Sequence, residues 1–272
     1  MTEKDIKEIK ELLSEPKSII IIHHKNADGD AIGSSVALSN YLTLCGHKSN
    51  IISPNKFPEF LKWLDVDNEI LIFNNSENQI NLIKNADIIF TLDFNNLERC
   101  GDMTDIVSNS NSIKILIDHH ENPSKYANYM YSDTEISSTC EMIYHFIEKL
   151  GDNSKINSSI AEAIYTGIMT DTGSFKFSST SSITHKVVSD LIDKGADKTK
   201  IHNEIYDNNS IEKIKLLSYA LSKIEVIDEY NTSFISLSQN DLNKFSFKKG
   251  DTEGVVNYGL SIKDIKFAAI FI

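Results

Sequence analysis

Short strand-like segments alternate along the first half of the chain with segments in which apolar residues recur every three or four positions. The strand-like segments lie at 18–23, 49–53, 70–73, 87–92 and 113–117. The first of them contains four consecutive isoleucines, and an apolar run of this length is typical of a parallel strand covered on both faces. The pattern predicts an α/β domain, a mostly parallel sheet with helices on both faces.

Helices dominate the next part of the chain, and a small mixed module follows them. A Ser-x-x-Glu box at 138–141 predicts the start of a helix that Gly151 ends. Further helices are expected up to Thr170 and at 184–194, 198–206 and 211–224, with strands at 232–237 and 266–272. We therefore divide the chain into a first domain over 1–182, a helical linker over 183–210 and a smaller α+β module over 211–272.

Composition and charge limit the kinds of molecule that the protein is expected to bind. The 272 residues carry 27 Lys and Arg against 39 Asp and Glu, a net charge of −12, which argues against binding long nucleic acid through a basic surface. The three cysteines form no C-x-x-C pair, and no apolar run approaches the roughly 20 residues that span a bilayer. We expect a cytoplasmic protein with no membrane partner, and a homodimer is one arrangement that the sequence allows.

Histidines and aspartates follow three of the predicted strands. They are His24, Asp28 and Asp30 after the first, Asp93 after the fourth, and Asp118, His119 and His120 after the fifth. Because the carboxyl ends of parallel strands meet at one edge, these side chains should gather in one cleft. Crowded carboxylates are costly without a cation. Oxygen and imidazole ligands without thiolate suit Mn²⁺, Mg²⁺ or Co²⁺, and so many ligands suit two ions.

Each fragment alone has a plainer interpretation. An isolated Asp-Gly-Asp, such as residues 28–30, is usually a turn with helix-capping carboxylates. A His-His pair such as 119–120 is more often structural or on the surface. Their common placement after apolar strands favours the metal site over these interpretations.

Four motifs in this order resemble those of the DHH phosphoesterase family. They are His24-x-Asn-x-Asp28-Gly-Asp30, Leu92-Asp93, Asp118-His119-His120 and Gly167-Ile-Met-Thr-Asp171. The stretches Asp251-Thr-Glu-Gly254 and 266–272 are similar to the start of a DHHA1 domain. Within the family, length and domain pairing resemble most the bifunctional oligoribonucleases, or nanoRNases, that also dephosphorylate 3'-phosphoadenosine 5'-phosphate (pAp).

The resemblance implies a role for each motif residue. It assigns one metal to His24, Asp28 and Asp93, and the other to Asp30, Asp93, His119 and Asp171. Asp93 would then bridge two divalent ions, with Mn²⁺ as the expected metal. Asp118 would orient an imidazole, and His120 would face the substrate phosphate. His23 should point away from His24, because side chains alternate along a strand.

The resemblance implies a two-metal phosphoesterase that cleaves oligonucleotides of about two to five nucleotides to nucleoside 5'-monophosphates, and pAp to AMP. Short RNA or DNA and nucleotide bisphosphates would be its substrates. Two alternatives within the family are a phosphodiesterase for linear pApA or cyclic di-AMP and a family II inorganic pyrophosphatase. From a different class, an inactive nucleotide-binding regulatory protein ranks last, because all six ligands are present.

The chain ends within the apolar run 267–272. Because natural termini are usually polar and frayed, we expect the C-terminal module to be incomplete here and to continue past Ile272. The Arg-Ser and Gly-Gly-His segments with which the DHHA1 domains of such enzymes bind nucleotides do not occur in these 272 residues.

Overall fold

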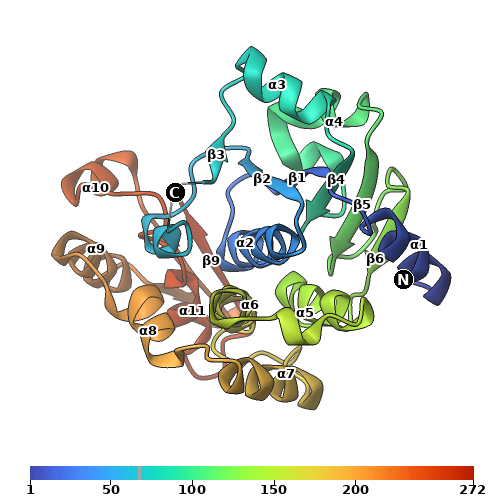
Figure 1. Ribbon diagram of the computed structural model, residues 1–272. Coiled ribbons are helices and arrows are strands. Elements are labelled where there is room, and N and C mark those ends of the chain that lie inside the picture. The colour runs from blue at the N-terminus through green and yellow to red at the C-terminus, as the bar shows by residue number, and fades with distance from the viewer. Residues whose placement is uncertain (67–68) are drawn as a thin grey trace. The chain divides into compact units, whose positions relative to one another are not determined.

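The structure is a computed structural model that describes residues 1–66 and 69–272 (Figure 1). It divides into two compact units. The first comprises 1–57 and the described part of 61–202, and the second comprises 58–60 and 203–272. The boundary at residue 202 falls inside the segment 183–210 that the sequence assigned to a linker.

A six-stranded sheet forms the centre of the first unit (Figure 1). Its strands, in spatial order, are β3 (Leu71–Ile72), β2 (Lys48–Ser53), β1 (Ser18–His23), β4 (Ile88–Leu92), β5 (Ile113–Asp118) and β6 (Tyr129–Ser132). Every neighbouring pair is parallel, which confirms the predicted parallel sheet. The sequence did not predict β6, because its four residues are mostly half-buried and show no long apolar run.

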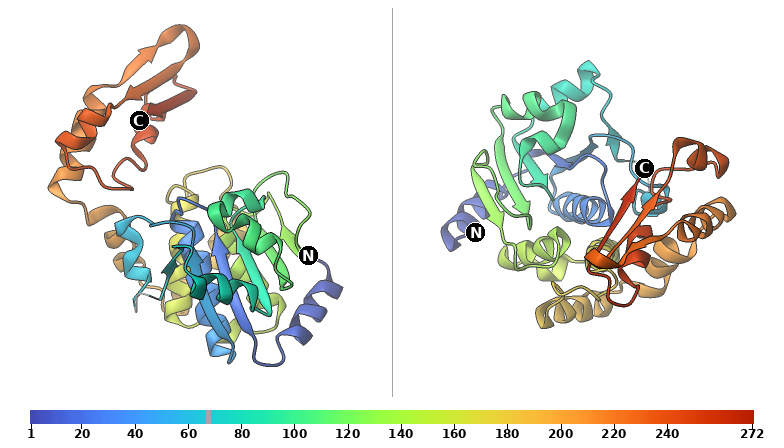
Figure 2. Two further views of the ribbon diagram at one scale, coloured as in Figure 1. Left: turned by 90° about the horizontal axis from the view of Figure 1, so that it is seen from above. Right: turned by 180° about the vertical axis from the view of Figure 1, so that it is seen from behind.

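Helices cover both faces of this sheet (Figure 2). On one face lie α2 (Gly29–Leu44), α5 (Thr139–Lys149) and α6 (Ser158–Asp171), and on the other lie α3 (Glu77–Lys84) and α4 (Thr104–Ser108). The remaining helices of this unit are α1 (Glu3–Leu12), α7 (Ser182–Asp193) and α8 (Lys198–His202), with 3-10 turns at Leu97–Met103 and Asn153–Lys155. None of the helices in the described residues is long and apolar enough to cross a membrane.

The second unit is a small module with its own three-stranded sheet. In that sheet β8 (Thr232–Ser236) lies between antiparallel β7 (Glu225–Ile227) and parallel β9 (Phe267–Phe271). Its helices are α9 (Ile211–Ser222), α10 (Gln239–Lys244) and α11 (Val255–Leu260), with a 3-10 turn at Asp228–Tyr230. A further 3-10 helix, Glu59–Leu64, begins with residues of this unit. Apolar side chains from α9, α11 and β8, among them Leu216, Val255 and Ile235, form its core.

The predicted helix at 198–206 is wrong in part. The α-helix α8 ends at His202, and a π-helical turn occupies Asn203–Asp207. Apolar spacing alone does not distinguish these two kinds of turn. The strands predicted at 232–237 and 266–272 are confirmed as β8 and β9.

Glycines allow α2 and α6 to approach closely. A Cβ placed on Gly33 of α2 would lie 2.6 Å from the carbonyl oxygen of Ala163 on α6, and one on Gly167 of α6 would lie 2.8 Å from Oδ1 of Asp30 on α2. Both distances are shorter than real contacts, so the two helices can pack at this separation only without side chains there. This contact positions the start of α2 and the end of α6, which both carry candidate ligands.

We expect Gly33→Ala to lower the free energy of unfolding by about 1 to 3 kcal/mol, because the new methyl group meets a backbone carbonyl that cannot rotate away. Urea unfolding in the presence of a chelator measures this effect without a contribution from bound metal. Thr43→Ala, at an exposed position of the same helix, should change the free energy by less than about 0.5 kcal/mol. Equal stability of the Gly33 variant and the parent would contradict the close-approach explanation.

Candidate metal centre

The candidate ligands meet where β1, β4 and β5 end. The neighbours of β1 are β2 on one side and β4 on the other, so the chain reverses its direction of winding between β1 and β4. Ligands of open α/β sheets bind beside such a reversal, outside the carboxyl ends of the strands. His24 follows β1 directly and Asp93 follows β4 directly.

One group of side chains joins the loop after β1 to the end of β4. The Nε2 atom of His24 lies 3.3 Å from Oδ2 of Asp93 and 3.8 Å from Oδ2 of Asp28. The other oxygen of Asp28 caps α2 by accepting hydrogen bonds from the backbone N–H groups of Asp30 and Ala31, at 3.1 and 3.0 Å. The cap leaves Oδ2 of Asp28 directed at the histidine, so this group offers one nitrogen and two oxygen ligands.

A second group joins α2, α6 and the segment after β5. The Nε2 atom of His119 lies 3.9 Å from Oδ2 of Asp30 and 3.6 Å from Oδ2 of Asp171. Asp30 lies in the first turn of α2, and Asp171 is the last residue of α6. In each of the two groups the ligand atoms lie within 4.8 Å of one another, close enough to hold a metal ion.

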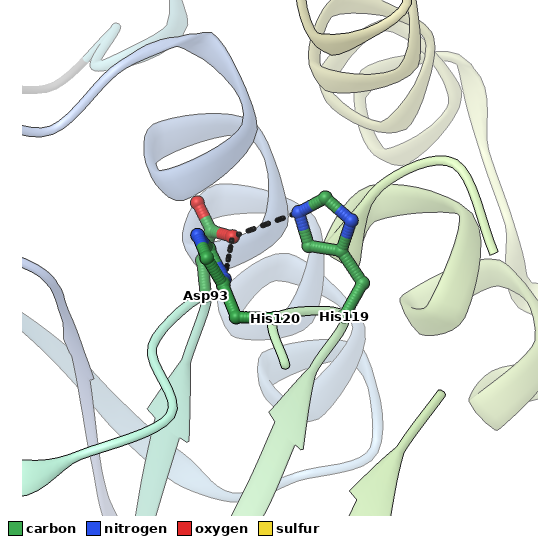
Figure 3. Close-up of side chains that lie close together, drawn as sticks. All are labelled: Asp93, His119 and His120. Atoms are coloured by element: carbon green, nitrogen blue, oxygen red, sulfur yellow. Dashed lines mark ion pairs between the residues drawn. The ribbon is translucent and has the colours of Figure 1, made fainter. Parts of the chain in front are cut away.

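Asp93 connects the two groups through its two carboxylate oxygens. Oδ2 faces His24, whereas Oδ1 lies 3.5 Å from Nε2 of His119. Figure 3 shows the contact between Asp93 and His119. The backbone of Asp93 has a φ of 63°, a conformation that aspartate adopts more readily than most residues but still rarely. The hydroxyl of Thr139 donates a hydrogen bond of 3.1 Å to Oδ1 and helps to hold the carboxylate in place.

Asp118 and His120 form a separate pair beside these groups. Nδ1 of His120 lies 2.7 Å from Oδ1 of the fully buried Asp118. A carboxylate accepts, so Nδ1 carries the proton and Nε2 is left for another partner. His120 also lies 3.7 Å from Oδ1 of Asp93 (Figure 3), and with Asp93 and His119 it makes a third group within metal-holding distance. The side chain of His120 is 34% exposed, and a substrate could therefore reach it.

The start of α5 holds Asp30, a contact that the sequence did not reveal. The backbone N–H groups of Thr139 and Cys140 donate hydrogen bonds of 2.6 and 2.8 Å to the two oxygens of Asp30. A helix N-terminus attracts negative charge, so it stabilises this carboxylate although only 1% of the residue is exposed. The box at Ser138 predicted where α5 begins, but no sequence signal indicated which carboxylate lies there.

The predicted capping box is correct only for its first residue. Ser138 accepts the backbone N–H of Glu141 at 3.1 Å. The carboxylate of Glu141 does not bond back to the cap. It accepts hydrogen bonds from the hydroxyl of Ser137 and from that of Thr184, which lies on α7.

The orientation of His24 suits a ligand. Its Nδ1 lies 2.9 Å from the carbonyl oxygen of Lys25, and because a carbonyl only accepts, Nδ1 is the donor and the neutral ring has its lone pair on Nε2. This arrangement is common for metal-binding histidines. His23 is fully buried, bonds to the carbonyl of His24 and belongs to none of the three groups.

Burial and crowding shift the pKa values of the cluster strongly. Burial alone would lower the pKa of His24 and His119, but the neighbouring carboxylates outweigh it and raise both to about 10. Burial and the charges of Asp93 and Asp171 raise the pKa of Asp30 well above its usual range, and burial raises that of Asp171 to about 6. Against the effect of its burial, the two histidines hold the pKa of Asp93 low.

These side chains fit a divalent cation. Without a cation, the raised pKa values favour proton retention on His24, His119 and Asp30, which reduces the negative charge of the cluster. Cations would replace those protons, since metal ligands bind in their deprotonated forms. Among the described residues, no cysteine belongs to these ligand groups. The remaining ligands are carboxylates and imidazoles, a set that suits Mn²⁺, Mg²⁺ or Co²⁺.

The raised pKa values predict how the stability of the metal-free protein depends on pH. His24 and His119 have pKa values of about 10 in the folded state against an ordinary 6.5, so their stabilisation is complete below pH 6.5 and is lost as the pH rises toward 10. The raised pKa of Asp30 acts in the same direction. We expect the free energy of unfolding in a chelator to fall between pH 6.5 and 9, by up to about 1.4 kcal/mol per pH unit for each proton.

Urea unfolding across this pH range measures the slope. A His24→Gln/His119→Gln double variant should show a smaller slope, because the two titrating groups are gone. A parent protein whose stability is constant from pH 6.5 to 9 would contradict the arrangement of charges described above.

Comparison with known proteins identifies the family. The profile described as "DHH family, N-terminal domain" matches residues 18–168. The bifunctional oligoribonuclease and PAP phosphatase NrnA of Bacillus subtilis is 28% identical over 260 residues, covering 94% of this chain and 77% of the relative. The probable NrnA of Streptococcus mutans is 28% identical over 259 residues, with the same coverage of 94% and 77%.

A solved structure agrees over nearly the whole chain. An exopolyphosphatase-related protein from Bacteroides fragilis superposes with a TM-score of 0.94 at 39% sequence identity, covering 98% of this chain and 80% of that one. The resemblance predicted from the four motifs is thereby confirmed, because the family profile spans more than half of the sequence and includes the first three motifs. This chain is a member of the DHH family.

Proposed function

We propose that this chain, a phosphoesterase of the DHH family, uses two divalent metal ions to cleave short oligonucleotides to nucleoside 5'-monophosphates and to remove the 3'-phosphate of pAp. His24, Asp28 and Asp93 would hold one ion, and Asp30, Asp93, His119 and Asp171 the other. Mn²⁺ is the proposed metal. The names of the two NrnA relatives support the substrate class.

The geometry of Asp93 is the observation that carries the proposal. Its oxygens face two different histidines, at 3.3 and 3.5 Å, and each histidine belongs to a different ligand group. One carboxylate shared between two ions is the arrangement expected of a two-metal hydrolytic site, where the ions lie about 3.5 to 4 Å apart. A single-metal site would not need ligands on both sides of this carboxylate.

The residues of the chain divide the remaining work between positioning and proton transfer. When bound, the metals supply positive charge for the phosphate oxygens and make a water molecule more acidic. Asp28 and Asp30 are fixed by backbone N–H groups, so the ligands are in place before substrate binds. Asp118 fixes the ring of His120 with a proton on Nδ1, and Nε2 then contacts the phosphate or donates a proton to the leaving oxygen.

The net charge of −12 fits a short substrate. A long nucleic acid needs a track of basic residues along its backbone, whereas a dinucleotide presents only one or two phosphates to the metals. In this proposal, pAp and dinucleotides share the feature that is recognised, a phosphate ester next to a nucleoside.

An assay with a substrate panel tests the proposal. The protein would be incubated with Mn²⁺ and a dinucleotide, pAp, linear pApA or pyrophosphate, and the products separated. We expect nucleoside monophosphates from the dinucleotide and AMP from pAp. Hydrolysis of pyrophosphate without hydrolysis of the dinucleotide would contradict the proposal in favour of a pyrophosphatase, and hydrolysis of pApA alone in favour of a dinucleotide phosphodiesterase.

Replacing the shared carboxylate should affect both metals. We expect Asp93→Asn to abolish hydrolysis and to weaken Mn²⁺ binding at both sites, measured by calorimetric titration, while the circular dichroism spectrum stays unchanged. Asp105→Asn removes an exposed carboxylate on α4 and should leave binding and turnover as in the parent. Two intact metal sites in the Asp93 variant would refute the shared-ligand assignment.

The two histidines of the DHH motif should separate metal binding from turnover. In His120→Ala we expect two bound metals but a rate reduced by roughly 10²-fold or more, the range for loss of a proton donor or a charge partner. In His119→Ala we expect loss of metal as well, because His119 lies in the second ligand group. Equal loss of metal in both variants would rule out this division.

A further inference from the structure

The turn after α6 has an unusual backbone beside a proposed metal ligand. Gly173, Ser174 and Phe175 follow Asp171 closely, and their φ angles are 56°, 61° and 67°. Three successive residues in the left-handed region are rare, and those other than glycine cost of order 1 kcal/mol or more each. Such strain persists only where the surroundings hold the turn.

Several contacts hold this turn in one conformation. The hydroxyl of Thr172 accepts the backbone N–H of Phe175, and its carbonyl accepts that of Phe177, both at 3.0 Å. The ring of Phe175 packs against the rings of Tyr165 and His185, with centroids 5.9 and 5.7 Å away. The turn is therefore a fixed support for the residue that it presents, Phe177.

Phe177 is partly exposed and lies against the turn that follows the proposed metal ligand Asp171. Its ring lies directly on Gly173, where a Cβ would come within 2.6 Å of Cζ, yet 41% of the residue remains exposed. The α-carbons of Gly173 and Asp171, two residues apart, are separated by at most about 7 Å. The tip of the ring therefore contacts the turn within two residues of a proposed metal ligand, and part of the side chain is accessible.

A cation accompanies this ring. The Nζ atom of Lys176 lies 5.8 Å from the centroid of Phe177, and Lys176 enters no ion pair in residues 1–66 and 69–272. An isolated exposed phenylalanine needs no explanation, but this one is held by a strained turn beside a phosphate-directed site and carries an unpaired ammonium. Aromatic rings stack with bases and ammonium groups attract phosphates.

We propose that Phe177 stacks against a base of the substrate and that Lys176 contacts a phosphate next to that base. The inference rests on the proposed function and names a specificity surface for the same site. The metals would hold the reacting phosphate, while the ring selects phosphate esters that carry a nucleobase over those that do not.

Steady-state kinetics of Phe177→Ala test the stacking. We expect the KM for a dinucleotide to rise roughly 5- to 100-fold, the range for loss of one stacked base, with kcat nearly unchanged because the interaction is made equally in ground and transition states. For an analogue with abasic sugars in place of both nucleosides, KM should be the same in both proteins. Phe177→Tyr should restore the parent KM.

Replacing an exposed apolar side chain far from the site provides the matched control for Phe177→Ala. Leu44 is 55% exposed at the end of α2 opposite the site, about 20 Å from the ligands at 1.5 Å per residue, and Leu44→Ala should leave KM unchanged. Lys176→Ala should raise KM for dinucleotide and abasic analogue alike, whereas Lys48→Ala, at the start of β2, should raise neither.

Fluorescence gives a readout that does not need catalysis. A dinucleotide that contains 2-aminopurine should lose fluorescence on binding to the metal-free parent protein and lose less on binding to Phe177→Ala. An unchanged KM in Phe177→Ala, or equal quenching in both proteins, would overturn the stacking inference. A parent protein that cleaves no dinucleotide but does cleave pyrophosphate would instead refute the proposed function, and the inference with it.

Discussion

Electrostatic repulsion between buried carboxylates is the constraint on which the rest of the site depends. Asp30 and Asp93 are almost completely buried, and Asp171 lies close to both. Burial of a charge costs several kcal/mol unless a partner offsets it. The chain meets this cost with two histidines and with backbone N–H groups at helix ends, and divalent cations would complete the neutralisation.

The fold explains how these charges come to lie together. Parallel strands bring His24, Asp93 and His119 to one edge of the sheet, and the glycine contact between α2 and α6 brings Asp30 toward Asp171. The start of α5 then directs its N–H groups at Asp30. The site is thus built on rigid elements, which hold the ligand positions precisely, as the proposed sharing of one carboxylate between two ions would require.

Sequence patterns predicted the elements that are strongly apolar and the motifs that follow them. The four isoleucines of β1 and the runs of β4 and β5 are buried on both faces, so their composition alone distinguishes them from helices. The strand β6 is short and half-buried, and nothing in its sequence separates it from a loop. The order of the strands depends on which crossovers pack together, which is a tertiary property.

The sequence predicted which residues form the candidate site but not how their side chains contact one another. The motifs identified the residues from His24 to Asp171 that the structure brings together. They did not indicate that the imidazole held by Asp118 belongs to His120, or that Thr139 supports both Asp30 and Asp93. The contacts of Thr139 join segments far apart in the chain, and they depend on where α5 begins relative to the sheet.

Electron paramagnetic resonance of the Mn²⁺-loaded protein, combined with a count of bound metal, tests the shared carboxylate most directly. Two manganese ions about 3.5 to 4 Å apart with a common ligand are magnetically coupled. We expect two ions per chain at saturation and a coupled spectrum in place of the six-line signal of isolated Mn²⁺. One ion per chain, or two ions with the spectrum of isolated Mn²⁺, would contradict the shared-carboxylate assignment.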